Sequence, residues 1–235
     1  SHDFTAKAGV VHSEIMLPEG APDCWLDRSA LWNEVEVVER RHDAVLAREV
    51  EFAIPRELSQ SDGIALAQDF VREQFVARGM VADLNVHWTT APNGEAQPHA
   101  HVMLSMRSIE GDRFGKKERG WNDRGLLVGW RERWAELANA RLCELDHDVR
   151  IDHRSYRDQG IALEPQNKIG PAGARREQRG EDAERAAEHR AIARRNGNAL
   201  LAKPETALRT LTQQRSTFSK QDLARLVNQH TDGAE

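Results

Sequence analysis

The chain has 235 residues, a length that fits one full domain with an appendage, or two small domains. With 39% hydrophobic and 30% charged residues, the composition is that of a water-facing protein with enough apolar residues for a core. The net charge of -5 argues mildly against non-specific binding of nucleic acid.

Targeting features are lacking in the sequence. Its apolar runs are short and interrupted by charges, which argues against a transmembrane helix and membrane insertion. The first residues have neither the basic nor the apolar region of a signal peptide. Cys24 and Cys143 lie far apart, so we expect neither a disulfide framework nor a cysteine metal site. These features favour a cytoplasmic location.

Hydrophobic periodicity predicts alternating strands and helices from residue 9 to residue 152. We expect strands at 9–17, 47–54, 80–90, 99–106 and 147–152, and helices at 29–44, 59–78 and 123–145. The turn sequence at 91–94 predicts a hairpin between the third and fourth strands, and 107–119 is expected to be a loop. This order predicts an α+β fold, with a central, mainly antiparallel sheet and helices on one face, followed by a helical C-terminal extension.

Three segments are expected along the chain. A first domain is predicted to end near residue 173, in a stretch rich in glycine and proline. Residues 174–199 are highly charged and predict an exposed helical connector. Two short helices are expected within 200–235, the second beginning with a capping box formed by Ser219 and Asp222.

The segment with the clearest chemistry is the predicted strand that begins at Pro98. Because side chains alternate along a strand, His99 and His101 point to the same face. His87 lies on the polar face of the preceding predicted strand, together with Asn85 and Thr89. Glu49 and Glu51 share the polar face of an earlier strand. If these faces coincide, three imidazoles and a carboxylate meet.

Such a cluster would suit a metal ion. Neutral imidazole is a ligand for Zn, Mn, Ni, Cu or Fe, and three protein ligands with an open position are typical of catalytic sites. Glu49 or Glu51 could fix the tautomer of a ligand histidine. The alternative from the pattern alone is that the histidines and glutamates are solvated residues on an exposed sheet. No phosphate loop, G-x-S-x-G or H-E-x-x-H motif competes with this site.

Several segments together resemble a known family. They are residues 47–55, His87, residues 98–101, residues 148–154 and residues 159–161. In this order they are similar to the MobA/MobL class of plasmid mobilisation relaxases, most of all to the relaxase domain of TraA-type conjugative proteins. The resemblance implies an HUH relaxase-like fold for 1–173. It also implies that 200–235 is the helical start of a following, helicase-like region.

The resemblance also implies an activity. Such relaxases nick and religate one DNA strand at a plasmid's origin of transfer, through a tyrosine nucleophile and a divalent metal ion such as Mn, Mg or Zn. The implied metal ligands are His87, His99 and His101, with Glu49 as the supporting catalytic acid. The implied partners are single-stranded origin-of-transfer DNA and other conjugation proteins.

The sequence differs from the family pattern in the position of its tyrosine. In the family this tyrosine lies on an early helix, before the region that this chain matches. The one tyrosine here, Tyr156, lies downstream of the histidines. We therefore expect an internal piece of a longer protein, one that cannot form the covalent intermediate alone.

Basic residues between 107 and 119 are candidates for contacts with DNA phosphates. They are Arg107, Arg113, Lys116 and Lys117, with Arg119 nearby. The alternative for any one of them is a solvated loop. Two other functions stay open for the chain as a whole: a non-catalytic module that binds origin DNA, and a histidine–metal hydrolase that uses bound water.

Overall fold

The structure is a computed structural model that describes residues 9–90, 94–165, 184–215 and 217–231. Contacts between residues divide the chain into two compact units, Ser1–His147 and Asp148–Glu235. Each unit is described by itself below. Among the described residues, no helix combines the length and the apolar character that crossing a bilayer requires.

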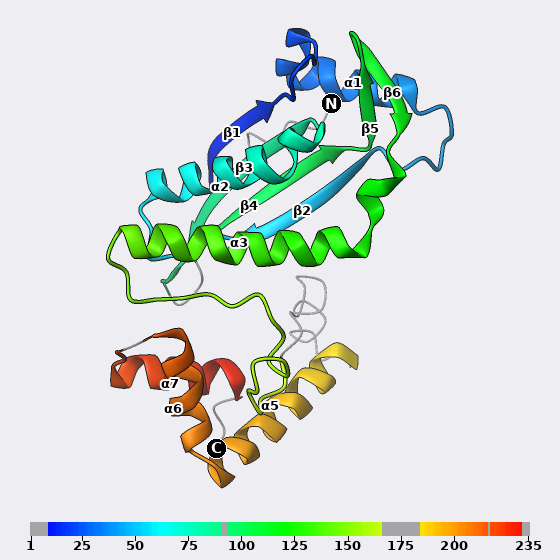
Figure 1. Ribbon diagram of the computed structural model, residues 1–235. Coiled ribbons are helices and arrows are strands. Elements are labelled where there is room, and N and C mark those ends of the chain that lie inside the picture. The colour runs from blue at the N-terminus through cyan, green and yellow to red at the C-terminus, as the bar shows by residue number, and fades with distance from the viewer. Residues whose placement is uncertain (1–8, 91–93, 166–183, 216, 232–235) are drawn as a thin grey trace. The chain divides into compact units, whose positions relative to one another are not determined.

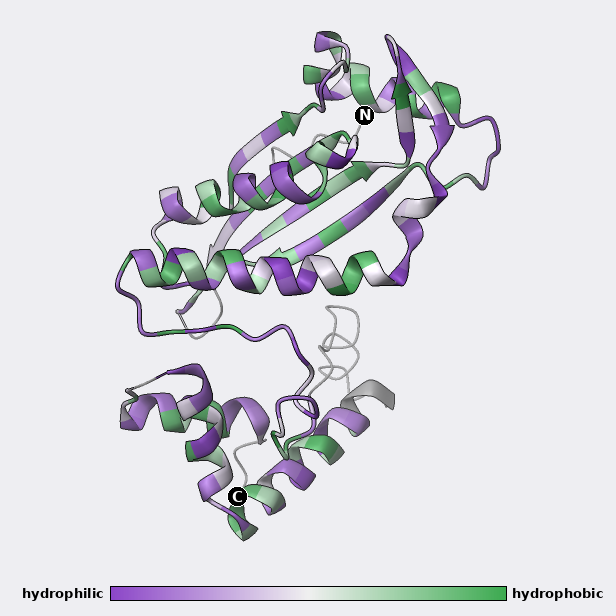
Figure 2. Cartoon of the chain, in the orientation of Figure 1, coloured by the Kyte–Doolittle hydropathy of each residue, from purple (hydrophilic) through white to green (hydrophobic). Residues whose placement is uncertain are grey.

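The first unit is built on a four-stranded antiparallel sheet (Figure 1). Its strands are β1 (Val10–Met16), β2 (Ala47–Ala53), β3 (Ala82–Thr90) and β4 (Ala96–Ser105), in the order β1-β3-β4-β2. The predicted hairpin is confirmed, since β3 and β4 pair along their whole length at the centre of the sheet. The strands alternate between hydrophobic and hydrophilic residues, as Figure 2 shows, so the two faces differ in character.

One face of the sheet is apolar and carries two helices, α2 (Gln60–Gln74) and α3 (Arg124–Glu144). Leu84, Val86 and Val102 from the central strands are completely buried on this face. Phe70 of α2 packs edge-on against Phe52 of β2, at a centroid distance of 5.1 Å. The short helix η2 (Val76–Arg78) follows α2. The antiparallel sheet with α2 and α3 on its apolar face confirms the predicted α+β class.

The opposite face is covered in part by the 3₁₀ helix η1 (Asp23–Leu26), helix α1 (Arg28–Val38) and a two-stranded hairpin, β5 (Arg107–Glu110) and β6 (Arg113–Lys117). The expectation of a loop at 107–119 was therefore wrong in part. Apolar residues hidden among the charges explain the difference, because Ile109 and Phe114 pack against the core beneath α1. Trp25 stacks on Phe114 with ring centroids 4.1 Å apart. The 3₁₀ helix η3 (Arg119–Asn122) then leads into α3.

Helix α1 ends at Val38, earlier than the predicted residue 44. The polar run that follows, Arg40-Arg41-His42-Asp43, is exposed and has no apolar face to bury. Packing therefore gives a helix no support there. Residues 39–46 instead form an irregular segment that leads into β2.

In the described part of the second unit, residues 148–165 are followed by helices α5 (Glu184–Ala202), α6 (Glu205–Gln214) and α7 (Lys220–His230). Its core is formed by Ile161, Leu163, Leu200, Ala207, Leu211 and Leu226. The capping box of Ser219 and Asp222 is confirmed at the start of α7.

Two expectations for this region differ from the structure. No strand forms at 147–152; this segment is irregular, and the amide of Arg150 donates to the carbonyl of Gln214. The expected boundary after residue 173 lies outside the described residues. Helix α5 buries Ile192 and Ala193, so its described part belongs to the core of the second unit and is not an exposed connector.

Candidate metal centre

Strand register places the three histidines together on the face of the sheet opposite α2 and α3. His87 of β3 lies directly across from His99 of β4, and His101 lies across from Asn85. Directly paired residues of antiparallel strands point to the same face, and so do alternate residues of one strand. The predicted convergence of His87, His99 and His101 therefore occurs.

The three imidazoles are nearly equidistant. Ring centroids are 5.1 Å apart for His87 and His99, 5.0 Å for His87 and His101, and 5.2 Å for His99 and His101. An imidazole nitrogen lies about 2.1 Å from a bound zinc ion, and the ring centroid lies roughly 1 Å further out, so three such rings have centroids about 5 Å apart. The spacing of the rings fits one shared metal ion.

Hydrogen bonds set the tautomers of two of these rings. Nδ1 of His101 donates to Oε1 of Glu49 over 2.7 Å, and Nδ1 of His99 donates to the backbone carbonyl of Gln97 over 2.9 Å. A proton on Nδ1 leaves the lone pair on Nε2, the nitrogen that could then bind a metal. Of the two predicted glutamates, Glu49 is thus the one bonded to the cluster.

The rings are not yet turned toward one point. His87 and His99 are nearly parallel, at an interplanar angle of 17°. In the part of the chain that the structure describes, no three His, Cys, Asp or Glu side chains already have the geometry of a metal site. The distances between ring centroids can suit a metal ion while the ring nitrogens point elsewhere, because these distances do not depend on where the nitrogens point. All three histidines are partly exposed, so rotation about side-chain torsions can bring the nitrogens together.

The cluster opens toward β2, at the edge of the sheet. Glu49, Glu51 and Ala53 of this strand share the face of the histidines and are exposed. Helix α1 lies instead over the β1 and β3 side of this face. The three imidazoles are partly exposed to solvent on this half.

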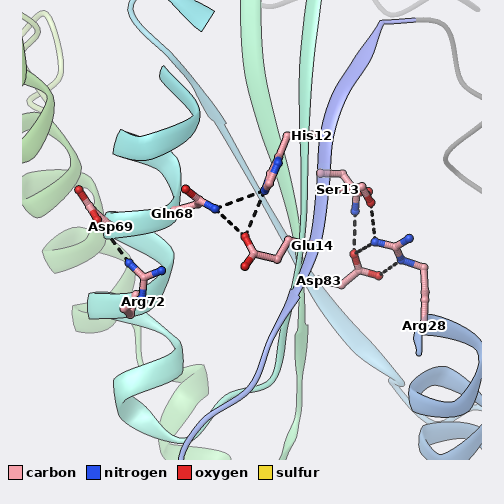
Figure 3. A network of polar contacts seen from close by, with 9 residues as sticks. His12, Ser13, Glu14, Arg28, Gln68, Asp69, Arg72 and Asp83 are labelled. Atoms are coloured by element: carbon pink, nitrogen blue, oxygen red, sulfur yellow. Dashed lines mark hydrogen bonds and ion pairs between the residues drawn. The ribbon is translucent and has the colours of Figure 1, made fainter. Parts of the chain in front are cut away.

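A buried carboxylate fixes α1 beside the cluster. Asp83, 2% exposed, accepts hydrogen bonds from Nε and Nη2 of Arg28 (Figure 3). Nε1 of Trp32 also donates to Asp83. It also accepts from the amide of Asn85, which lies on the same strand between Asp83 and His87. Asp83 was not among the residues predicted from the sequence, although a charge within the apolar run from Met80 to Val86 was a usable signal.

The far side of β1 carries a separate polar contact, in which Gln68 of α2 donates to Glu14 over 2.7 Å (Figure 3). His12 lies 3.1 Å from the same carboxylate. His12 therefore belongs to the packing of α2 against the sheet and faces away from the metal-binding candidates.

The four basic residues proposed to contact DNA fall into two groups. Arg107 and Lys117 both bind the carboxylate of Glu39, whose side chain is 6% exposed, at 2.8 and 3.1 Å. Burial raises the pKa of Glu39, but the hydrogen bonds and charges of Arg107 and Lys117 outweigh it, and its pKa lies below the usual value. Arg113 and Lys116 are exposed on the hairpin. Contact of any of these residues with DNA stays a prediction.

Tyr156 lies in the second unit and contributes to its core. Its ring centroid is 5.6 Å from that of His230, and its hydroxyl lies 3.5 Å from Nε2 of this histidine. Burial raises the pKa of the phenol. That Tyr156 is not the attacking group stays a prediction.

Comparison with known proteins identifies the family of this chain. The model of the MobA/MobL family matches residues 1–179. The chain is 34% identical to the conjugal transfer protein TraA of Rhizobium radiobacter, covering 98% of this chain and 24% of that protein. It is 37% identical to the mobilization protein MobL of Acidithiobacillus ferridurans, covering 78% of this chain and 56% of that protein.

A solved structure is similar in both fold and sequence. It is described as "Molecular Basis of Vancomycin Resistance Transfer in Staphylococcus aureus" and superposes with a TM-score of 0.59 at 32% identity. The match covers 66% of this chain and 80% of that one. This chain spans about a quarter of the TraA relative. The family match over residues 1–179 confirms the resemblance drawn from the sequence, and the chain belongs to the MobA/MobL family.

Proposed function

We propose that this chain carries the metal-binding and DNA-binding part of a relaxase. It would bind single-stranded DNA at a plasmid origin of transfer and support nicking and religation of that strand. The observation that carries the proposal is the cluster of His87, His99 and His101, with pairwise ring distances of 5.0–5.2 Å, on an open sheet face. Membership of the MobA/MobL family supports the same reading.

The three histidines would hold a divalent cation (Mn, Mg or Zn), which supplies Lewis-acid stabilisation of charge on the phosphoryl oxygens. Glu49 keeps the proton of His101 on Nδ1 and so presents Nε2 to the open face. The exposed strand β2 leaves room for a DNA strand over this face.

Strand transfer exchanges one phosphoester for another. A tyrosine oxygen attacks the phosphorus, the tyrosine loses its proton, and the released strand end takes a proton to become a hydroxyl. The bond to tyrosine keeps the linkage available for religation. We propose that this tyrosine is not Tyr156, because the phenol of Tyr156 is half-buried against His230 in the second unit.

Metal content tests the ligand assignment. We expect the chain to retain a divalent ion after dialysis, and we expect His99→Ala and His101→Ala to lose it. His42→Ala is the matched control, since His42 lies exposed in the segment before β2. Equal metal content in all four proteins would contradict the assignment.

An assay with origin DNA tests the reaction. We expect the chain to bind a single-stranded origin oligonucleotide without forming a covalent adduct. Nicking with an adduct should appear when a tyrosine-containing segment of a MobA/MobL relative is joined upstream of residue 1. An adduct on Tyr156 would contradict the proposal. Cleavage that leaves no adduct would favour the metal hydrolase that uses bound water.

A further inference from the structure

A second candidate site lies in the first unit, between the end of α1, the segment that follows it and the hairpin β5–β6. It is a pocket of about 620 Å³. Its charged lining residues are Glu39, Arg40, Arg41, Asp43, Arg107 and Lys117. We refer to it as the Glu39 pocket. None of its residues takes part in the histidine cluster.

Two cations of the Glu39 pocket are held in place before any ligand arrives. Arg107 donates through Nε to Glu39 and through Nη1 to the carbonyl of Gly115. Lys117 contacts Glu39 and donates to the carbonyl of Val45 over 2.9 Å. An Arg has five N–H donors and a Lys three, so these bonds leave further donors on each side chain. Fixed cations lose little conformational freedom on binding an anion.

The charge balance of the pocket favours an anion. Four cationic side chains line it against two anionic ones, a net excess of two positive charges. The carboxylate of Glu39 is 6% exposed and already bonded to Arg107 and Lys117, so it presents little charge to solvent. Arg40 and Arg41 are exposed at the mouth, and Arg41 has Asp43 as its partner at 2.9 Å.

The pocket lies at the end of β4, beyond the histidines. Arg107 follows His101 by six positions, so at about 3.3 Å per residue the two residues are at most roughly 20 Å apart. A stacked strand rises about 3.4 Å per nucleotide along its axis, so about six nucleotides, or fewer in a stretched strand, would span that distance. One DNA strand can therefore reach both sites.

We propose that the Glu39 pocket binds a phosphodiester group of the single strand whose scissile bond lies at the histidine cluster. This proposal rests on the proposed function, since it requires that the chain bind single-stranded DNA. The pocket would hold the strand several nucleotides away from the reacting phosphate and fix its register. Recognition of a phosphate by cations positions a strand without reading its sequence.

The first experiment measures binding of a labelled single-stranded oligonucleotide by fluorescence anisotropy, without added metal, over a series of salt concentrations. The variant Arg40→Gln/Arg41→Gln removes exposed cations and leaves the buried Glu39 contacts intact. The control is Arg131→Gln, which removes one exposed cation from α3 on the other face of the sheet. We expect weaker binding by the double variant, and a fall of about 0.7 in the salt slope for each lost phosphate contact. The control should match the unaltered chain.

The second experiment identifies the phosphate. Oligonucleotides with a single uncharged methylphosphonate, placed at each position in turn, are compared on the unaltered chain and on the double variant. A phosphate in the Glu39 pocket predicts one position where neutralisation weakens binding to the unaltered chain more than binding to the double variant, which keeps Arg107 and Lys117. This non-additivity is the signature of a direct contact.

The outcomes separate this proposal from the proposed function. If the chain binds the oligonucleotide but the double variant behaves like Arg131→Gln, the Glu39 pocket is not a phosphate site and the relaxase proposal stands. Additive effects at every methylphosphonate position would also overturn the pocket. If the unaltered chain binds no single-stranded DNA, both proposals fail. Displacement by free phosphate at equal ionic strength would point to a small-anion site and overturn the strand-binding role.

Discussion

Glu49 reaches diagonally across the sheet to His101: Oε1 of this β2 residue lies 2.7 Å from Nδ1 of the imidazole on β4. The residue directly opposite His101 is Glu51, two positions further along β2. Both carboxylates are exposed on the same face, so their different contacts make them a matched pair for experiment.

Substitution of Glu49 and of Glu51 by glutamine should affect metal binding unequally. Glu49→Gln should weaken metal binding about 10–100-fold, because partners of ligand histidines fix the tautomer and raise ligand basicity. Glu51→Gln removes the same charge without removing the bond to His101 and should change affinity much less. Isothermal titration with Mn²⁺ or Zn²⁺ measures both. Equal losses would mean that charge alone, and not the hydrogen bond, supports the site.

Asp83 should be a large contributor to the stability of the first unit. Asp83→Asn puts an amide donor against the donors of Arg28 and Trp32, and breaking a buried pair costs about 3–5 kcal/mol. Because the side chain of Arg28 is 25% exposed, we expect the lower end, about 3 kcal/mol.

Urea unfolding followed by tryptophan fluorescence measures this loss, since all six tryptophans lie within residues 1–147. Asp69→Asn is the control: Asp69 is 51% exposed and contacts Arg72 at 3.4 Å, so we expect a loss under about 1 kcal/mol. Similar losses in the two variants would show that burial of Asp83 does not matter.

Two helix glycines should respond to alanine in opposite directions. A Cβ on Gly63 of α2 would lie 2.9 Å from Cζ3 of Trp88 and 3.0 Å from Cγ2 of Ile54. This overpacking costs about 1–3 kcal/mol and outweighs the gain in helix propensity. A Cβ on Gly129 of α3 would meet nothing within 4 Å, so Gly129→Ala should gain about 1 kcal/mol. Thermal unfolding of both variants measures the signs, and a stabilised Gly63→Ala would contradict the packing at Trp88.

His230 should make the second unit sensitive to acid. Burial lowers the pKa of His230 in the folded chain. An unfolded histidine takes up a proton near pH 6.5, so the unfolded state binds more protons as the pH falls below that value. The contribution of His230 to stability is therefore present above about pH 6.5 and is lost as the pH falls through the lower folded pKa.

Fluorine NMR can follow this loss, because 3-fluorotyrosine in place of the single tyrosine reports on the second unit. Tyr156 lies with its ring centroid 5.6 Å from that of His230. We expect the urea concentration at the midpoint of this transition to decrease when the pH is lowered from about 7 to about 5. The decrease should be smaller in His230→Phe. The same fall in the variant would assign the acid sensitivity to other groups.

The sequence was most informative where local pattern and burial agree. Strict alternation in β2 and β4 predicted both strands and put His99 and His101 on one face, because the period of a strand is two. The capping box at Ser219 was predictable because it joins groups three residues apart. The prediction of a loop at 107–119 was wrong in part because Phe114 contacts Trp25, nearly ninety positions earlier, and no local pattern encodes that contact.

Sequence by itself determined which residues could form a candidate metal centre, and to which face of its strand each one points. Tertiary structure decided that His87 lies across from His99 and that Glu49, not Glu51, bonds to His101, since strand register depends on pairing between distant segments. The tertiary structure also decided that Arg107 and Lys117, two members of a basic run in the sequence, form ion pairs with Glu39. A charge run in sequence carries no information about the buried carboxylate that the fold brings against it.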